Sequence, residues 1–554
     1  MGVERGTIGT YPLTLHHIFS RMRDLHADKH IVTKTDDGLV EATYGDMVDR
    51  ILRLVAALSD LGVGQGDAVG TVMMNSQAHA ELYMAVPLMG AVLHTINPRL
   101  HKGQLAYIVN DAEDRVVVVD AHLMPAFDQV AGEVKTVEHL IVLGGGGQVA
   151  TAHDVPVHDY EELVASHDPV DGLPEIDENA AAAACYTSGT TGDPKGVVYT
   201  HRSIYLHTFG VCLPDALGVR EDDVLMPVVP QFHAMAWGSV HAALMVGADL
   251  VMPHRFLEPE PVAELLSSQK VTITEAVPTV WNGLKALLMQ EGARERYDLS
   301  SLRAVVIGGS AVPEALLRFF EEEYDVPVLH AWGLTETSPI GTVARLRKAH
   351  ADADEDTKMH RRLTQGRPVA GIDLRLIDQK DGETPAPWDG ETVGEIEVRG
   401  PWVAERYGNM DAPERFHDGW LRTGDVAVMH PDGYIEIVDR TKDLIKSGGE
   451  WISSVELENT LMGHPDVLEA AVIAMPDEKW DERPMAVVVL QEGAEATADD
   501  LNGFLSERVA KFWLPDRYEF IDEIPKGATG KFSKLELRER FFGERQAAPG
   551  AHRT

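Results

Sequence analysis

Helical and strand-like patterns of apolar residues alternate along most of the chain. Segments 44–61 and 261–268 have apolar residues at helical spacing, whereas 115–119, 302–307 and 326–331 are short apolar runs bounded by polar turns. Helices that alternate with short buried strands are typical of α/β proteins with largely parallel sheets. We therefore expect a large N-terminal α/β domain built from parallel-sheet subdomains.

The pattern changes twice toward the C-terminus. Short β runs with Asp-Gly turns in 372–399 indicate a small β-subdomain. Beyond Arg440, two helical segments (455–461 and 498–511) alternate with two strand-like ones (470–474 and 485–489), which indicates a smaller α+β domain. The predicted boundaries are 1–439 for the large domain, 440–446 for a hinge, 447–545 for the small domain and 546–554 for a disordered tail.

Composition places the chain among globular proteins of a reducing compartment. Apolar residues make up 44% of its 554 positions, which is ordinary for a globular protein. The only cysteines, Cys185 and Cys212, cannot form a disulfide framework. Residues 1–6 have no apolar signal core, and the longest apolar stretch, 82–93, contains Pro87 and is too short to span a bilayer. We expect a cytoplasmic protein without stable membrane insertion, in which 82–93 is buried.

The charge is strongly acidic. Asp and Glu number 88 against 49 Lys and Arg, for a net charge of −39. Such a surface argues against nucleic acid or anionic membranes as partners. Only 17 of the basic residues are lysine, a balance similar to that of proteins from salt-accumulating halophiles. A high-salt cytoplasm is one interpretation; an ordinary acidic cytosolic enzyme is the other.

A loop rich in glycine and hydroxyl residues, 186–196, follows the apolar run 180–185. Gly189 and Gly192 let the backbone approach an anion closely, because glycine has no Cβ and tolerates positive φ. Backbone N–H groups, hydroxyls and Lys195 then offer donors to phosphate oxygens. The spacing differs from that of the common P-loop. The loop is either a phosphate site of another kind or a flexible surface loop.

Four further segments carry residues suited to nucleotide chemistry. Segment 330–339 follows an apolar strand, so it lies at the carboxyl edge of a sheet, where α/β folds bind ligands. Segment 419–425 ends in an aspartate after a glycine turn, 439–453 is a charge cluster at the predicted domain joint, and 525–531 ends in a lysine held by a glycine turn. Taken singly, these segments are equally consistent with capped turns, a solvated linker and an inert surface lysine.

Two weaker segments, 231–237 and 308–310, combine aromatic, histidine and glycine residues. Each could line a pocket or belong to the core. The His, Cys and Asp residues show no zinc-ligand spacing.

Together these segments resemble the adenylate-forming superfamily of acyl-CoA synthetases, luciferases and peptide-synthetase adenylation domains. Residues 188–196 match every fixed position of its Ser/Thr-Gly-Thr-Thr-Gly-x-Pro-Lys-Gly signature. The resemblance runs from about residue 13 to 542, with the segments in family order, and 442–453 is similar to bacterial and archaeal medium- to long-chain fatty acyl-CoA synthetases. One departure is Trp332, where the family usually has tyrosine.

The resemblance implies roles for individual residues. The implied catalytic residues are Lys531, Lys195, Glu336 and the hinge residue Lys442. The implied ATP- and AMP-binding residues are Thr187, Ser188, Gly189, Thr190, Thr191, Gly192, Gly309, His330, Ala331, Trp332, Thr335, Glu336, Asp425, Arg440, Lys442, Lys446 and Trp451. His233, Ala234, Trp237 and Gly309 would border the acyl pocket, and Thr187 and Glu336 would hold Mg²⁺.

The implied activity is that of an AMP-forming acyl-CoA synthetase. ATP activates a medium- or long-chain fatty acid as an acyl-adenylate, and the acyl group then passes to coenzyme A. The small domain would rotate about Lys442 between the two steps, and a homodimer is implied by the fatty acyl relatives. The alternatives are a ligase for an aryl, short-chain or sulfur-containing acid, acyl delivery to a carrier protein, a luciferase-like oxygenase, and a non-catalytic nucleotide-binding protein.

Overall fold

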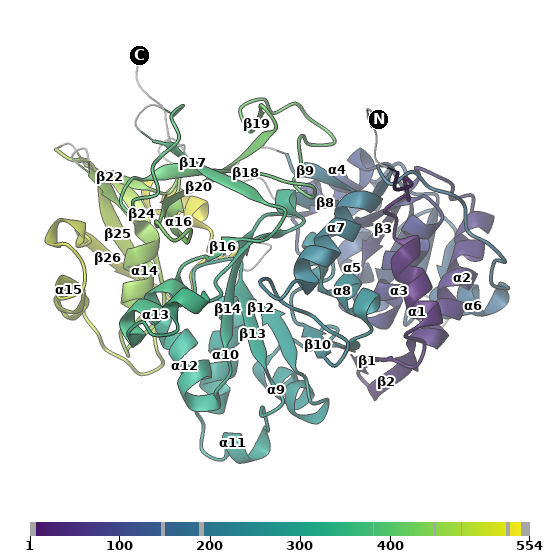
Figure 1. Ribbon diagram of the computed structural model, residues 1–554, viewed down its shortest axis with the longest axis horizontal. Coiled ribbons are helices and arrows are strands. Elements are labelled where there is room, and N and C mark those ends of the chain that lie inside the picture. Colours follow the sequence, from purple (N-terminus) through teal and green to yellow (C-terminus); the bar gives the residue numbers. More distant parts are fainter. Residues whose placement is uncertain are drawn as a thin grey trace.

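The computed structural model describes residues 7–145, 150–187, 193–379, 382–447, 450–477, 479–527 and 532–543. In Figure 1 the N-terminal elements lie at one end of the molecule and the C-terminal elements at the other. Between them the chain forms two large sheets and a smaller one, followed by a fourth sheet in the C-terminal part. The prediction of a large α/β domain followed by a smaller α+β domain is confirmed.

The first large sheet has seven strands, parallel except at one edge. In sheet order the strands are β7 (Val157–Asp159), β6 (His139–Leu143), β5 (Asp114–Asp120), β3 (Ala68–Val72), β4 (Val92–Thr95), β8 (Ala181–Thr187) and β9 (Lys195–Thr200). Every residue of β3 is buried, as expected for a parallel sheet covered on both faces.

The second large sheet has nine strands, with a parallel centre and antiparallel edges. In sheet order they are β16 (Arg367–Pro368), β15 (Ile340–Val343), β14 (Val328–Gly333), β13 (Ala304–Gly308), β12 (Ile273–Ala276), β10 (Val224–Pro227), β11 (Asp249–Met252), β1 (His30–Thr35) and β2 (Gly38–Thr43).

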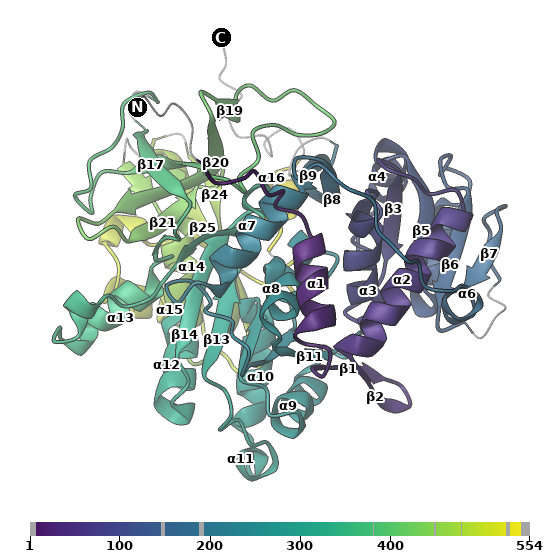
Figure 2. The same cartoon turned by 45° about the vertical axis from the view of Figure 1, so that its right-hand side comes forward.

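Helices cover both large sheets. They are α1 (His16–Asp24), α2 (Tyr44–Asp60), α3 (Gln77–Leu88), α4 (Lys102–Asp111), α5 (Met124–Phe127), α6 (Tyr160–Ser166), α7 (His201–Cys212), α8 (Ser239–Val246), α9 (Pro259–Ser268), α10 (Pro278–Leu288), α11 (Ala293–Arg296), α12 (Glu314–Tyr324) and α13 (Glu355–Leu363). Figure 2 shows α7 and α8 between the two sheets. One continuous apolar core includes residues from both sheets and from these two helices, so the large domain is a single packed body.

Helix starts follow from local capping. Thr43 accepts a hydrogen bond from the Asp46 backbone N–H, and the Asp46 side chain accepts from the Thr43 backbone N–H, which forms a capping box at the start of α2. Pro259 begins α9, where a missing N–H costs nothing. The predicted buried segment 82–93 is confirmed, since Leu82 and Leu88 have no exposed surface.

The β-subdomain and the small domain follow. The β-subdomain sheet consists of β17 (Asp373–Asp378), β18 (Gly394–Arg399), β20 (Trp420–Met429) and β19 (Phe416–His417), with β21 (Ile435–Arg440) paired to β20. The small-domain sheet consists of β23 (Glu450–Ile452), β22 (Ile445–Ser447), β25 (Asp481–Leu490) and β24 (Val467–Asp477), with β26 (Arg517–Phe520) paired to β25. Its helices are α14 (Ser454–Met462), α15 (Ala498–Ser506) and α16 (Lys534–Phe542).

One predicted helix differs from the structure in extent. The helix expected over 498–511 ends at Ser506, and residues 511–513 form a separate 3-10 turn instead. In the acidic segment 351–356, Asp354 caps α13 and Glu355 begins it, because carboxylates favour a helix N-terminus. Among the described residues, no helix combines the length and apolar character needed to cross a membrane. The predicted tail 546–554 lies outside the described residues.

Candidate active site

The glycine-rich loop connects two antiparallel strands rather than a strand and a helix. Thr187, the last residue of β8, pairs with Lys195, the first residue of β9. The two strands thus carry these side chains to the same end of the seven-stranded sheet. Ser188, Gly189, Thr190, Thr191 and Gly192 lie outside the described residues, so their contacts stay predictions.

Lys195, Tyr407 and Glu336 form one cluster beside this hairpin. The Lys195 ammonium lies 5.0 Å from the centre of the Tyr407 ring, within the range of a cation–π contact. The Tyr407 hydroxyl donates to Glu336 Oε1 at 2.6 Å, and the Arg415 guanidinium lies 3.8 Å from the same oxygen. Glu336 is 6% exposed. A buried carboxylate held by two partners has a fixed orientation, so it can present its remaining lone pairs in a constant direction.

A loop between β18 and β19 holds this cluster together. The Gly408 N–H donates to the Gly196 carbonyl and the Ala404 N–H to the Glu336 carbonyl, both at 2.8 Å. Asn409 accepts from the Gly196 N–H at 3.2 Å. Through these bonds, one loop positions both the phosphate-type hairpin and Glu336.

Trp332, Asp425 and Arg440 form a second cluster. The Trp332 indole N–H donates to Asp425 Oδ2 at 2.9 Å, and the Arg440 guanidinium meets Asp425 Oδ1 at 2.8 Å. Strand pairing brings this about, because Asp425 of β20 is directly opposite Arg440 of β21. The charge of Asp425 raises the pKa of Arg440, and Glu336 contributes to the same shift. The two clusters are therefore electrostatically connected.

Two other residues of the 330–339 segment, Thr335 and His330, have contacts that the structure describes. The Thr335 carbonyl accepts from the Tyr199 hydroxyl of β9 at 2.8 Å, so this segment touches the hairpin strands. The His330 ring is buried and its Nδ1 faces the Leu363 carbonyl at 3.0 Å. Burial lowers the pKa of His330 to about 4, so the ring is neutral at ordinary pH. For His330, as for Ala331, nucleotide contact through the backbone stays a prediction.

The predicted acyl-pocket segment has an unusual backbone. Ala234, Met235, Ala236 and Trp237 all have positive φ, between 44° and 56°. A run of left-handed residues with side chains is costly, at roughly 1–2 kcal/mol per residue, and such strain gathers at functional sites. Gly308 makes room for this turn, because a Cβ there would lie 3.1 Å from the Trp237 ring. Trp237 thus packs beside Gly308, next to the exposed Gly309 at φ +87°.

A small cavity adjoins this turn, with a volume of about 20 Å³. His233 and Ala234 line it, together with Cys185 and Phe232. The other lining residues are Thr95, Asn97, Leu100, Ile108 and Tyr186. Two residues of β8, Cys185 and Tyr186, are among those that line the cavity, and β8 ends at Thr187. That the cavity receives the acyl group stays a prediction.

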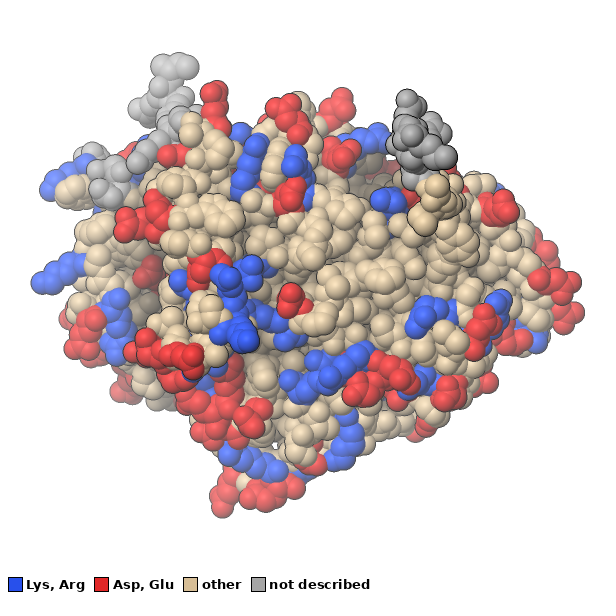
Figure 3. Space-filling view, in the orientation of Figure 1, with Lys and Arg blue, Asp and Glu red and all other residues tan. Residues whose placement is uncertain are grey.

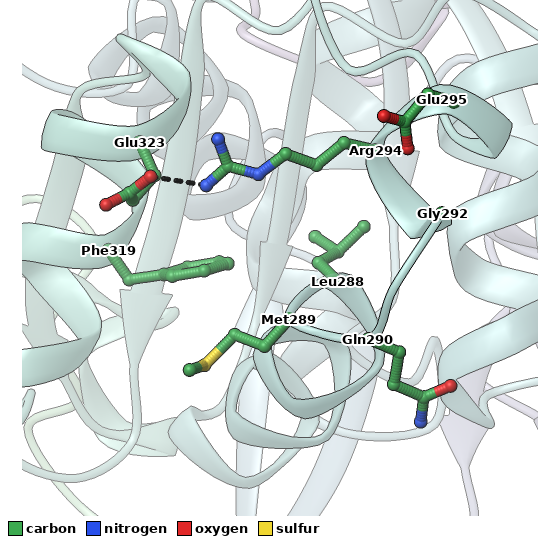
Figure 4. A pocket seen from close by; sticks show the side chains of 8 residues that line it. All are labelled: Leu288, Met289, Gln290, Gly292, Arg294, Glu295, Phe319 and Glu323. Atoms are coloured by element: carbon green, nitrogen blue, oxygen red, sulfur yellow. Dashed lines mark hydrogen bonds and ion pairs between the residues drawn. The ribbon is translucent and has the colours of Figure 1, made fainter.

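A larger hollow lies elsewhere. It has a volume of about 390 Å³ and is open to solvent between α10, α11 and α12. Figure 4 shows that the Arg294–Glu323 ion pair crosses its upper part, with Phe319 and Met289 below. It contains none of the predicted site residues, so it is a surface groove formed by helix packing.

The predicted hinge links two sheets through a short turn. Strand β21 ends at Arg440 and β22 begins at Ile445. The Asp443 and Leu444 N–H groups both donate to the Arg440 carbonyl at 2.9 Å. Lys442 is half-buried in this turn, and burial lowers its pKa. The boundary at 440–446 stays a prediction.

Hydrogen bonds between Asp439 and Ser454 cross this turn, and Lys534 supports Ser454 from within the small domain. Asp439 Oδ2 accepts from the Ser454 backbone N–H at 2.7 Å and from its hydroxyl at 2.5 Å. Lys534 of α16 meets the Ser454 hydroxyl at 2.5 Å and Glu458 at 2.7 Å. The bonds to Asp439 must break or rearrange if the small domain rotates relative to β21.

The small-domain candidates are only partly described. Lys446 and Trp451 pair across the β22–β23 hairpin, where the Lys446 ammonium lies 5.8 Å from the Trp451 ring. Both side chains are exposed, so their contact with nucleotide stays a prediction. Lys531 lies outside the described residues.

Tyr407, Asn409 and Arg415 were missed by the sequence analysis. They lie between predicted β segments, with neither helical nor strand-like periodicity. The run of polar residues beside Gly408 was the one available signal.

The residues at Glu336 suit a magnesium ion. Mg²⁺ prefers oxygen ligands, and the Glu336 carboxylate and the Thr187 hydroxyl are ligands of that kind. Because Tyr407 and Arg415 engage Oε1, the carboxylate is oriented before any ion binds.

Comparisons with known proteins give matches along most of the chain. The profile described as AMP-binding enzyme matches residues 20–408, and that described as AMP-binding enzyme C-terminal domain matches residues 456–531. The 3-methylmercaptopropionyl-CoA ligase of Ruegeria pomeroyi is 42% identical over 96% of this chain and 97% of its own length. The long-chain-fatty-acid–CoA ligase of Thermus thermophilus is 44% identical over 96% of each chain.

Solved structures with the same fold include an anthranilate CoA ligase, AuaEII, in complex with anthranoyl-AMP. It aligns with a TM-score of 0.84 at 28% identity, over 96% of this chain and 97% of its own. The alignment spans both the large and the small domain.

Proposed function

The chain belongs to the AMP-binding enzyme family and is an AMP-forming acid–CoA ligase, and we propose that its acid substrate is a medium- or long-chain fatty acid. The observation that carries the proposal is the 44% identity to the long-chain-fatty-acid–CoA ligase of Thermus thermophilus over 96% of each chain. Leu100, Ile108 and Phe232, on the wall of the small cavity beside β8, offer apolar contact to an acyl group.

In the first half-reaction, the substrate carboxylate attacks the α-phosphorus of ATP and pyrophosphate leaves. We assign Lys195 and the Thr187 hydroxyl to the phosphate oxygens, and Asp425 to the ribose hydroxyls. Lys531 would bridge the carboxylate and the α-phosphate, where negative charge develops. Magnesium held by Glu336 and Thr187 would neutralise charge on the phosphates.

In the second half-reaction, the coenzyme A sulfur attacks the acyl carbon and AMP leaves. We propose that the small domain rotates about Lys442 between the steps, which withdraws Lys531 and opens the site to the thiol. The hydrogen bonds from Ser454 to Asp439 support this proposal, because they give the small domain a defined set of partners in the orientation seen here.

A second candidate substrate is a short sulfur-containing acid. Two observations favour it: the 3-methylmercaptopropionyl-CoA ligase named for Ruegeria pomeroyi is similar over nearly the whole chain, and the cavity beside Phe232 has a volume of only about 20 Å³. A medium or long acyl chain would require Phe232 or its neighbours to move.

Pyrophosphate release distinguishes the two substrates. We would measure it with ATP and Mg²⁺ across straight-chain acids from C2 to C18, with 3-methylmercaptopropionate and benzoate in parallel, each with and without coenzyme A. The fatty-acid proposal expects a CoA-dependent maximum of kcat/KM at medium or long chains. A maximum at 3-methylmercaptopropionate or butyrate would replace it with the second candidate.

A variant of the cavity wall sharpens this test. Phe232→Ala should increase kcat/KM for longer acids relative to short ones, because it enlarges the cavity that Phe232 lines. Trp388→Phe, at an exposed tryptophan outside the site, is the matched control and should leave the chain-length profile unchanged.

We also propose that the protein is cytoplasmic, in a cytoplasm of high salt concentration. A homodimer is a further proposal. Sedimentation velocity in dilute and in molar KCl would determine the oligomeric state.

A further inference from the structure

Asp120, His122 and His254 converge where strands of the two large sheets end, and none of the three belongs to the two active-site clusters. Asp120 is the last residue of β5 in the seven-stranded sheet, and His122 lies in the short turn that follows it. His254 follows β11 of the nine-stranded sheet. Because β5 and β11 both end here, side chains that follow strands of two separate sheets lie close together.

The spacing of the three side chains suits a metal ion. One ligand atom from each residue lies within 4.8 Å of the other two. His254 Nε2 is 3.4 Å from Asp120 Oδ2, and the two imidazole rings have their centres 5.2 Å apart. Ligand atoms around tetrahedral zinc, with bonds of about 2.0–2.2 Å, lie about 3.3 Å apart. Small side-chain rotations would therefore complete three of four positions.

A buried oxygen of Asp120 has no partner. The residue is 2% exposed, and its Oδ2 accepts from the Met74 backbone N–H at 2.7 Å. Its Oδ1 is buried and has no hydrogen-bond partner within the described part of the chain. Buried carboxylate oxygens are rarely left without a partner, and a cation bound between Asp120 and the two histidines would supply one.

The charges nearby allow a cation. Arg255 is paired with Asp36, so its positive charge is largely offset.

A second group of the same type provides a comparison. His360, His430 and Glu436 also have ligand atoms within 4.8 Å of one another. There, however, Glu436 Oε2 accepts from both histidines, at 3.3 and 2.9 Å. Burial favours a higher pKa for Glu436, but the bonds from the two histidines lower its pKa to about 2. The bond to Glu436 raises the pKa of His360. This group is satisfied as an ion pair, without a buried oxygen that lacks a partner.

We propose that Asp120, His122 and His254 form a binding site for a divalent transition-metal ion such as Zn²⁺, which cross-links the two sheets of the large domain. Two imidazoles and one carboxylate are a ligand set typical of zinc and of other first-row divalent metals. The fourth position would be occupied by water. The ion is separate from the magnesium proposed at Glu336.

The test is metal binding by the full-length protein after dialysis against chelator. We would titrate Zn²⁺ by calorimetry and Co²⁺ by visible absorption, and measure Tm with and without Zn²⁺. The wild type should bind one equivalent tightly and show a higher Tm with zinc. His122→Ala should weaken the affinity at least tenfold; because His122 is exposed, this variant should fold normally. His254→Ala should behave in the same way.

The matched control is His360→Ala, which removes a histidine from the ion-paired group. It should retain the wild-type zinc affinity and the zinc-dependent rise in Tm. The proposal is overturned if the wild type binds no zinc at 100 µM, if His122→Ala binds as tightly as the wild type, or if only His360→Ala loses binding.

Discussion

At the scale of single residues, Trp332 gives the site a contact that a phenylalanine could not make. Its indole N–H donates to the carboxylate proposed to hold the ribose. The rest of the ring is packed against Gly341, where a Cβ would lie 2.7 Å from it. The family position usually holds tyrosine; here the indole nitrogen makes a polar contact with Asp425.

Replacing Trp332 with phenylalanine should weaken ATP binding. The variant removes a hydrogen bond to a charged group, worth about 1.5 kcal/mol or more, and so removes one of the two contacts, with Trp332 and Arg440, that orient the Asp425 carboxylate. We expect the KM for ATP to rise about tenfold, with a smaller change in kcat, as measured by pyrophosphate release.

An exposed tryptophan supplies the control for that variant. Trp388 is 53% exposed, and Trp388→Phe should leave the KM for ATP unchanged. If Trp332→Phe also left this KM unchanged, the indole–carboxylate bond would have no part in nucleotide binding.

The residues that belong to sequence motifs could be predicted, and those that support them could not. Glu336, Asp425 and Arg440 stand at fixed positions in recognisable segments, and the structure brings them together. Tyr407 and Arg415 reach Glu336 from a loop some 70 residues further along. Their position depends on the three-dimensional path of that loop, which cannot be predicted from the local pattern of apolar and polar residues.

At the scale of secondary-structure elements, the hinge turn is the part on which the proposed mechanism depends. It is closed by two hydrogen bonds to the Arg440 carbonyl. Proline at position 442 would fix its own φ and restrict residue 441. We therefore expect Lys442→Pro to form acyl-adenylate at a near-normal rate and to slow thioester formation by at least tenfold, measured with acid plus ATP and with supplied acyl-adenylate.

Lys531→Ala is the matched variant, and its effect should be opposite. It should abolish adenylate formation while largely sparing thioester formation from supplied acyl-adenylate. Normal overall turnover by Lys442→Pro, or equal losses of both steps in Lys531→Ala, would contradict the proposed rotation.

Element types were more predictable than element ends. The short apolar runs at 302–307 and 326–331 correspond to β13 and β14, because a parallel strand buried on both faces must be apolar throughout. The helix expected over 498–511 ends early because Leu505 is its last fully buried residue, and only a buried face holds a helix this short. Packing, rather than propensity, sets that boundary.

At the scale of the whole molecule, the acidic surface is the main feature. Figure 3 shows acidic side chains along the lower edge and the right-hand end of one face, with basic side chains between them. With a net charge of −39, repulsion between like charges destabilises the folded state when ions are scarce.

Stability should therefore rise with salt. The Debye length falls from about 30 Å at 0.01 M to about 3 Å at 1 M, so molar KCl removes most of the long-range repulsion. We expect the Tm in 1–2 M KCl to exceed that in dilute buffer by roughly 5 °C or more. A Tm that is unchanged or lower in molar KCl would argue for an ordinary acidic enzyme.

The pairing of Asp425 with Arg440 has a thermodynamic consequence. Arg440 is the residue at which β21 ends and the hinge turn begins. Asp425, the proposed ribose acceptor, is therefore ion-paired with the first residue of the hinge turn. If the orientation of the small domain alters that pair, nucleotide affinity and domain orientation are reciprocally linked. The factor by which bound AMP favours one orientation must then equal the factor by which that orientation tightens AMP binding. Product release and domain rotation would be two expressions of a single coupling free energy.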